Sequence, residues 1–176
     1  MSEKNQISQP EPWLRATLGE VPVVARAAIH ALQLAKEDLH RWASPLTEEE
    51  LDAGPFSLPS VGFHLRHIAG SLDRLLTYAE NRELAPHQIA FLKSELDSTG
   101  HPRASFADFD KALEQSEARI RLLAIADLNE KREVGGKKLP TTVGSLLVHV
   151  ADHTQRHVGQ AITTAKLLLQ NRTPQH

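Results

Sequence analysis

The chain has 176 residues, 40% of them hydrophobic, a length that suits one domain with a sizeable core. Its 20 basic and 22 acidic residues are well mixed and give a net charge of −2, so nothing favours nucleic acid or an anionic membrane as a partner. The lack of cysteine excludes disulfides, thiolate metal sites and a cysteine nucleophile.

The N-terminal residues are polar and contain no apolar core of a signal peptide. No apolar run approaches the roughly 18 residues that a membrane span requires, so we expect a cytoplasmic protein. We expect residues 1–12 to form a loose arm, residues 13–171 a single domain and residues 172–176 a tail.

Apolar residues recur at helical spacing in four long stretches, near 22–43, 60–80, 105–126 and 142–170. The first begins with Pro22, which suits a first helical turn, and the second with Ser60, which suits an N-cap. Ser105 and Asp108 have the spacing of a capping box at the start of the third. Pro140-Thr141-Thr142 opens the fourth, so each long stretch has both the period and the start signal of a helix.

Shorter helical pieces are predicted after Thr47 and from Ala85 to about Leu96. No alternating strand pattern is evident, and we interpret residues 130–139 as a basic, solvated connector. The sequence therefore predicts an all-α fold, a four-helix bundle with short helical inserts.

Histidines recur at intervals of four in the last predicted helix, at His149, His153 and His157. A helical projection places His153 and His157 in the apolar stripe and His149 on its border. A lone histidine on an apolar face is usually a hydrogen-bonded core residue. Two buried imidazoles one turn apart both need partners, however, and one shared cation would satisfy both.

The second long helix offers His64 and His67 as further ligands. His64 lies nearer the centre of the apolar arc, whereas His67 lies on its flank with Ser71. Periodicity alone therefore favours His64.

Two segments together resemble the DinB-like family of DinB/YfiT-type metal-binding four-helix bundles. One is His67-Ile68-Ala69-Gly70-Ser71, and the other runs from His149 to Gln160. The resemblance extends from about residue 22 to residue 170. It implies a metal site made of His67, His153 and His157, in place of the choice of His64. It also implies that His64, Ser71, His149 and Gln160 lie nearby, in the pocket or as outer hydrogen-bond partners.

The sequence departs from this family at one place. Many relatives carry an acidic residue just after the histidine of the second helix, where this chain has Gly70 and Ser71. Asp73 and Glu80 do not replace it, because they project away from His67 or lie far along the helix. No carboxylate from this segment is therefore expected to support the metal.

Three neutral imidazoles leave positions on a divalent metal for water or substrate, as in catalytic zinc sites. Zinc or nickel suits such a site, and iron or manganese would also fit. The resemblance implies an S-transferase that joins a low-molecular-weight thiol, such as bacillithiol, mycothiol or glutathione, to a small electrophile. The alternatives are a metal-dependent hydrolase that uses metal-bound water and a non-catalytic metal-binding, stress-related protein. An open pocket favours the enzymes, and a fourth protein ligand favours the non-catalytic protein.

The first long helix is apolar around much of its circumference, which one bundle seam cannot bury. The segment around Trp13 and Leu14 could cover part of this surface. A second copy of the chain could cover the rest through a two-fold interface. We therefore expect a homodimer that acts on a small-molecule substrate.

Overall fold

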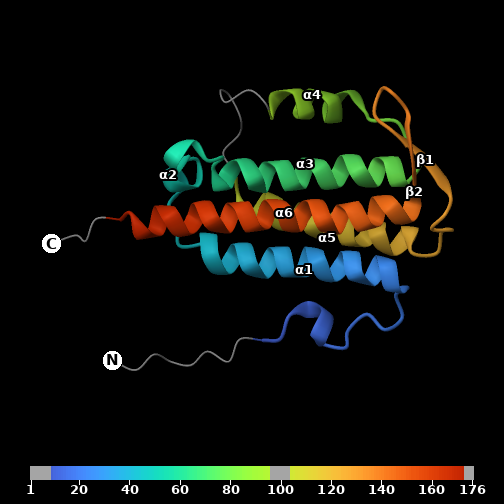
Figure 1. Ribbon diagram of the computed structural model, residues 1–176, viewed down its shortest axis with the longest axis horizontal. Coiled ribbons are helices and arrows are strands. Elements are labelled where there is room, and N and C mark those ends of the chain that lie inside the picture. The colour runs from blue at the N-terminus through green and yellow to red at the C-terminus, as the bar shows by residue number, and fades with distance from the viewer. Residues whose placement is uncertain (1–8, 96–103, 173–176) are drawn as a thin grey trace.

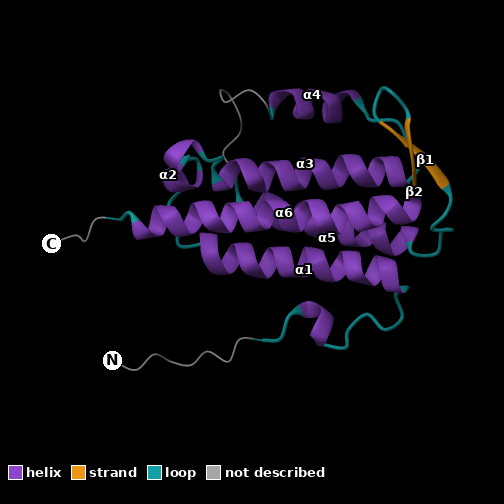
Figure 2. Ribbon diagram, in the orientation of Figure 1, coloured by secondary structure: helices purple, strands orange, loops and turns teal. Residues whose placement is uncertain are grey.

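The computed structural model describes residues 9–95 and 104–172, so most of the expected arm and tail lies outside the described residues. Four long helices form its body, as Figures 1 and 2 show. They are α1 (Val23–Ala43), α3 (Val61–Ala79), α5 (Phe106–Leu123) and α6 (Val143–Gln170). This confirms the predicted all-α four-helix bundle, with each helix beginning and ending within a few residues of its expected bounds.

Each long helix packs against two others, in the cyclic order α1, α6, α3, α5. In Figure 1, α3 and α5 run in one direction, and α1 and α6 run in the other. A short helix, α4 (Pro86–Ser94), returns the chain along the outside of α3, so that α5 can start at the same end as α3. The histidine-bearing helices α3 and α6 are therefore antiparallel neighbours.

Small polar residues start the helices as the sequence predicted. The Ser60 hydroxyl accepts a hydrogen bond from the Phe63 amide at 3.0 Å, and the Ser105 hydroxyl accepts one from the Asp108 amide at 3.0 Å. Thr47 and Glu50 form a capping box at α2 (Glu48–Leu51). Such caps are worth about 1 kcal/mol each and fix where a helix begins.

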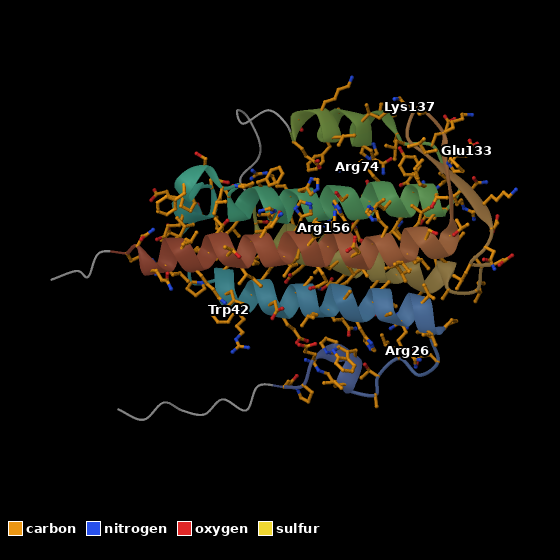
Figure 3. The ribbon with its side chains drawn as sticks, viewed as in Figure 1. Arg26, Trp42, Arg74, Glu133, Lys137 and Arg156 are labelled. Carbon is orange, nitrogen blue, oxygen red and sulfur yellow. The ribbon has the colours of Figure 1, made fainter. Side chains whose placement is uncertain are left out.

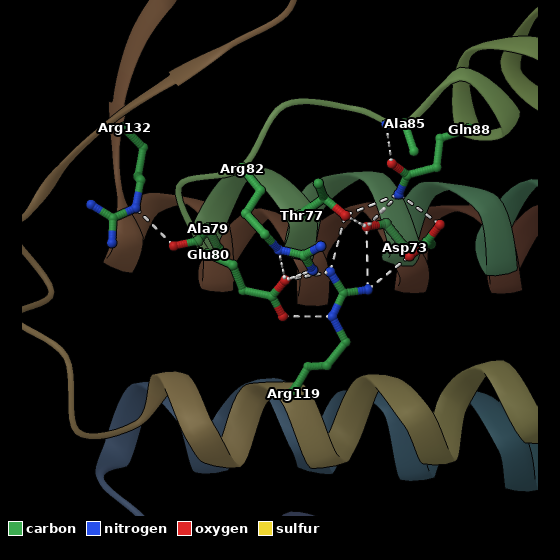
Figure 4. Close-up of polar contacts among 9 residues, drawn as sticks. All are labelled: Asp73, Thr77, Ala79, Glu80, Arg82, Ala85, Gln88, Arg119 and Arg132. Carbon is green, nitrogen blue, oxygen red and sulfur yellow. Dashed lines mark hydrogen bonds and ion pairs between the residues drawn. The ribbon is translucent and has the colours of Figure 1, made fainter.

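The interpretation of residues 130–139 as a solvated connector without strands is wrong. The segment contains a hairpin of β1 (Lys131–Val134) and β2 (Leu139–Thr142), with Val134 opposite Leu139 and Gly135 at φ 71° in the turn. Strands of four residues are too short for alternation to stand out, and the buried side chain of β1 is Arg132, not an apolar residue. Its Nε donates to the Ala79 carbonyl at 2.7 Å, which fastens the hairpin to the end of α3 (Figure 4).

The segment before α1 folds back along that helix, beginning with a 3-10 turn, η1 (Pro12–Leu14). Arg15 forms a bidentate ion pair with Glu37, both bonds at 2.6 Å, and the Thr17 hydroxyl lies 3.2 Å from His30 Nε2. Trp13 and Leu14 themselves stay 61% and 55% exposed. A second 3-10 turn, η2 (Pro55–Ser57), lies between α2 and α3.

A polar network holds α4 and α5 to α3 (Figure 4). Gln88 of α4, which is buried, donates to Asp73 Oδ2 at 2.7 Å and to the Thr77 hydroxyl at 2.9 Å. Arg119 of α5 donates to Asp73 Oδ1 at 2.8 Å and to Glu80 Oε1 at 2.6 Å. These bonds fix the positions of α4 and α5 against α3.

Among the described residues, no helix is long and apolar enough to cross a membrane.

Candidate metal centre

Three of the histidines predicted from the sequence meet in the seam between α3 and α6. Ligand-capable nitrogens of His67, His153 and His157 all lie within 4.8 Å of one another. In residues 9–95 and 104–172 this is the one cluster of three or more histidines or carboxylates with a spacing that could hold a metal ion. The group is the one that the family resemblance implied.

The spacing of these nitrogens suits a single ion. The Nε2 atoms of His67 and His153 are 3.0 Å apart, and the Ser71 hydroxyl lies 3.3 Å and 3.2 Å from them respectively. Two nitrogens bound tetrahedrally to one zinc ion at its usual bond length would lie about 3.3 Å apart. Little movement would therefore bring them onto a common ion.

His67 is oriented by a carboxylate that sequence reasoning missed. Glu95, directly after α4, has a side chain only 5% exposed, and its Oε2 lies 3.0 Å from His67 Nδ1. Arg74 of α3 donates to the other carboxylate oxygen at 2.9 Å, and Figure 3 places Arg74 between α3 and α4. A His67 that donates from Nδ1 keeps its Nε2 lone pair free for a metal.

The electrostatics of Glu95 favour this role. Burial alone would raise the pKa of its carboxyl group, but hydrogen bonds from His67 and Arg74 outweigh burial and hold the pKa below its usual value. The carboxylate is therefore ionised at neutral pH and accepts from both partners.

Gly70 explains how Glu95 reaches His67. A Cβ atom at residue 70 would collide with the Phe91 ring and would lie 2.7 Å from Glu95 Oε1. The departure from the family pattern noted in the sequence thus leaves the space that α4 and its carboxylate occupy. The expectation of no such carboxylate from α3 itself agrees with the contacts, since Asp73 and Glu80 pair with Arg119.

His64 is fully buried and lies behind His157. The two Nδ1 atoms are 3.0 Å apart, and His64 Nε2 is the one buried side-chain nitrogen or oxygen without a partner among the described residues. Because His157 turns Nδ1 toward His64, its Nε2 is the atom left to meet the other two ligands. Periodicity alone was therefore right that His64 is buried but wrong to prefer it to His67 as a member of the group.

Burial keeps these imidazoles neutral. It is the largest effect that lowers the pKa of His64, His153 and His157, each to about 4, and repulsion between neighbouring histidines, were they protonated, lowers the pKa further. After burial, His157 has the largest effect on the pKa of His64 and of His153, and His67 has the largest effect on the pKa of His157. Neutral imidazole is the form that binds metals, so His153 and His157 need no deprotonation at pH 7.

The other two predicted neighbours lie at the edge of the group. His149 is exposed, with its ring centroid 5.3 Å from that of His153 and its Nδ1 3.9 Å from Asp152. Gln160 is exposed on α6. Arg156, on the same helix in Figure 3, is held by Asp152 at 2.6 Å. Within the described chain the cluster therefore stays at three histidines, all partly open to solvent.

Comparison with known proteins gives a family and a fold. A profile of the DinB superfamily matches residues 31–161. Among curated proteins, none matches the chain. A solved structure described as the conserved protein of a locus from Enterococcus faecalis is 19% identical, with a TM-score of 0.60 over 85% of this chain and 99% of that one. At this identity the structural likeness shows a common fold alone.

Proposed function

Because the chain belongs to the DinB superfamily, we propose that it is a metal-dependent enzyme whose divalent ion is held by His67, His153 and His157. One observation carries the proposal: three imidazoles from two antiparallel helices bring ligand-capable nitrogens to within 4.8 Å of one another. Such a group would be costly to bury without a partner, and a cation supplies one. Zinc or nickel suits this all-nitrogen set best, although iron and manganese would also fit.

The surrounding residues support such a site by fixing the direction of each ring. Glu95 holds the proton of His67 on Nδ1. His64 can accept the Nδ1 proton of His157 in the same way. Outer partners of this kind orient metal ligands and raise their basicity. Ser71, within 3.3 Å of two ligand nitrogens, can hydrogen-bond a molecule that approaches the open side.

For the reaction we propose transfer of a low-molecular-weight thiol to a small electrophile. A divalent ion at this site would lower the pKa of a coordinated thiol or water molecule, so that a nucleophile forms at neutral pH. The chain has no cysteine, so a thiol must come from a cosubstrate. The partly exposed face of the histidine group gives such a cosubstrate access.

The test is metal analysis of protein purified without a histidine tag, followed by thiol-transfer assays with bacillithiol, mycothiol and glutathione. We expect about one divalent ion per chain, and transfer to a reactive aryl halide that depends on that ion. His153→Ala should lose both properties, whereas His87→Ala, on the exposed face of α4, should keep them. Wild-type protein that binds no divalent ion would contradict the proposal.

A hydrolase that uses metal-bound water is the second candidate. The same partial exposure supports it, since water reaches the histidine group as readily as a thiol does. Ester hydrolysis without added thiol, abolished by a chelator and by His153→Ala, would favour it over the transferase. A non-catalytic metal-binding role has less support, because it was tied to a fourth protein ligand and the described cluster has three.

A further inference from the structure

A cavity lies on the side of α3 that faces away from the α6 histidines. It has a volume of about 430 Å³ and is enclosed by α3, α4 and α5. Its floor consists of small residues on α3 and α5, namely Ala69, Gly70, Ala112 and Ser116, and Phe91 of α4 forms a wall. Small-molecule sites typically occupy roughly 300–1,000 Å³. The volume of this cavity therefore suits a compact ligand. None of the three clustered histidines lines it.

The charged side chains around this cavity are already paired. Arg74 binds Glu95 through both terminal nitrogens, at 2.9 Å and 3.3 Å. Arg119 binds Asp73 and Glu80. A charged ligand would have to break one of these pairs, so the lining favours an uncharged molecule with a mainly apolar body.

Two donors remain for a polar group on that molecule. Ser116 is 3% exposed, and within the described chain its hydroxyl forms no hydrogen bond. The hydroxyl oxygen is not completely buried, so a ligand can still reach it. Arg74 is 7% exposed, and its Nε likewise has no partner among the described residues. Both residues line the cavity.

The helix register brings the two donors together. Arg119 of α5 contacts Asp73 and Thr77 of α3, and the two helices run in parallel. Ser116 precedes Arg119 by about one turn of α5, so it lies at the level of Asp73 and Arg74 along α3. A ligand with one acceptor oxygen between these two side chains is therefore the kind that this lining favours.

We propose that this cavity is a second ligand site, for an uncharged, mainly apolar small molecule whose carbonyl or hydroxyl oxygen accepts hydrogen bonds from Ser116 and Arg74. The apolar body packs against Phe91, Ala69 and Ala112. None of the three clustered histidines lines the cavity, so the proposal does not depend on the metal or on the reaction proposed there.

Acetophenone is a suitable probe, because it combines an aromatic body with one carbonyl acceptor. We expect saturable shifts of the amide resonances of Phe91, Ala112 and Ser116 in ¹H–¹⁵N spectra of the full chain. Ethylbenzene has nearly the same shape without the acceptor, and should bind roughly three- to tenfold more weakly. Ser116→Ala should weaken acetophenone binding by a similar factor and leave ethylbenzene binding unchanged.

Filling the cavity provides the second arm of the test. Ala112→Leu should weaken acetophenone binding more than tenfold, while Ala118→Leu, an identical change at an exposed position of α5, should not. Matching melting temperatures would show that both variants fold. His153→Ala should bind acetophenone as the wild type does, which separates this site from the metal proposal. Wild-type affinity in Ala112→Leu, shifts confined to other regions, or equal affinity for ethylbenzene would each overturn the proposal.

Discussion

On the α5 side of helix α3, a cationic side chain pairs with carboxylates. On the α6 side of α3, imidazole nitrogens face other imidazole nitrogens without a group of opposite charge between them. Arg119 donates to Asp73, Thr77 and Glu80 at 2.6–3.3 Å, so its guanidinium is fully engaged. Across the other seam, nitrogens face nitrogens at 3.0 Å, and His64 Nε2 has no partner among the described residues. The first arrangement is complete without a ligand, while the second gains partners when a cation binds. The contrast separates residues whose contacts hold the fold together from a group of histidines that could hold a metal ion.

The largest expected effect is on the α6 side. His67→Ala removes one of three ligands and should abolish zinc binding, with affinity lowered by more than about 100-fold. His64→Ala removes only an outer partner of His157 and should lower affinity by about tenfold. Competition with a chromogenic chelator measures both. Equal losses in the two variants would contradict the assignment of His67 as the ligand.

The α5 side should show the opposite behaviour. Arg119→Ala removes the ion pairs with Asp73 and Glu80, which keep Gln88 and Arg82 as partners, so we expect a loss of about 2 kcal/mol in the free energy of unfolding. Zinc affinity should stay within twofold of wild type. Urea unfolding gives the first quantity and chelator competition the second. Arg121→Ala, which removes surface pairs with Glu117 and Glu20 on the same helix, is the matched control.

Glu95, directly after α4, supports the α6 side, because it contacts His67 and also pairs with Arg74. Glu95→Gln keeps the size of the side chain but weakens both contacts, and should reduce zinc affinity about tenfold. Glu83→Gln, at an exposed position before α4, should change nothing. Unaltered affinity in Glu95→Gln would mean that the carboxylate supports only Arg74.

The sequence and the structure agree most closely where local chemistry decides. Ser60, Ser105 and Thr142 cap α3, α5 and α6, so the helix bounds could be predicted closely. The i, i+4 spacing also indicated His153 and His157. His67 was identified by family resemblance and not by periodicity, because its side chain lies at the edge of the buried arc, where a projection distinguishes poorly.

Glu95 and the hairpin escaped prediction for a different reason. The place of Glu95 depends on how α4 packs over Gly70, a contact between residues 25 positions apart that no local pattern encodes. In β1 the buried side chain is a charged residue, Arg132, so alternation carried no apolar signal. Both cases show tertiary contacts deciding what propensity and period leave open.

Acid should weaken the fold through the imidazoles of the α6 side. The folded-state pKa values of His64, His153 and His157 are lowered to about 4, below the unfolded value of about 6.5. The unfolded chain therefore binds more protons between these values. The stability of the metal-free protein is fully present above about pH 6.5 and is lost as the pH falls toward 4. Urea unfolding at pH 7 and pH 5 should show the loss, and His64→Leu should reduce it; an identical pH dependence in that variant would contradict this account.

We propose that the chain forms a homodimer. Of all the changes considered, loss of this dimer should affect the two sides of α3 least. Val23 of α1 and Val148 of α6 remain 69% and 59% exposed, and these two helices pack against each other. The folded-back N-terminal segment covers another part of α1, through Arg15 and Thr17. The exposed apolar residues that remain favour a second copy as the covering surface. Light scattering should give about twice the 19.5 kDa of one chain, and Val148→Lys should shift the mass toward that of the monomer without changing zinc affinity. A mass near 19.5 kDa for the wild type across a wide concentration range would rule out the dimer.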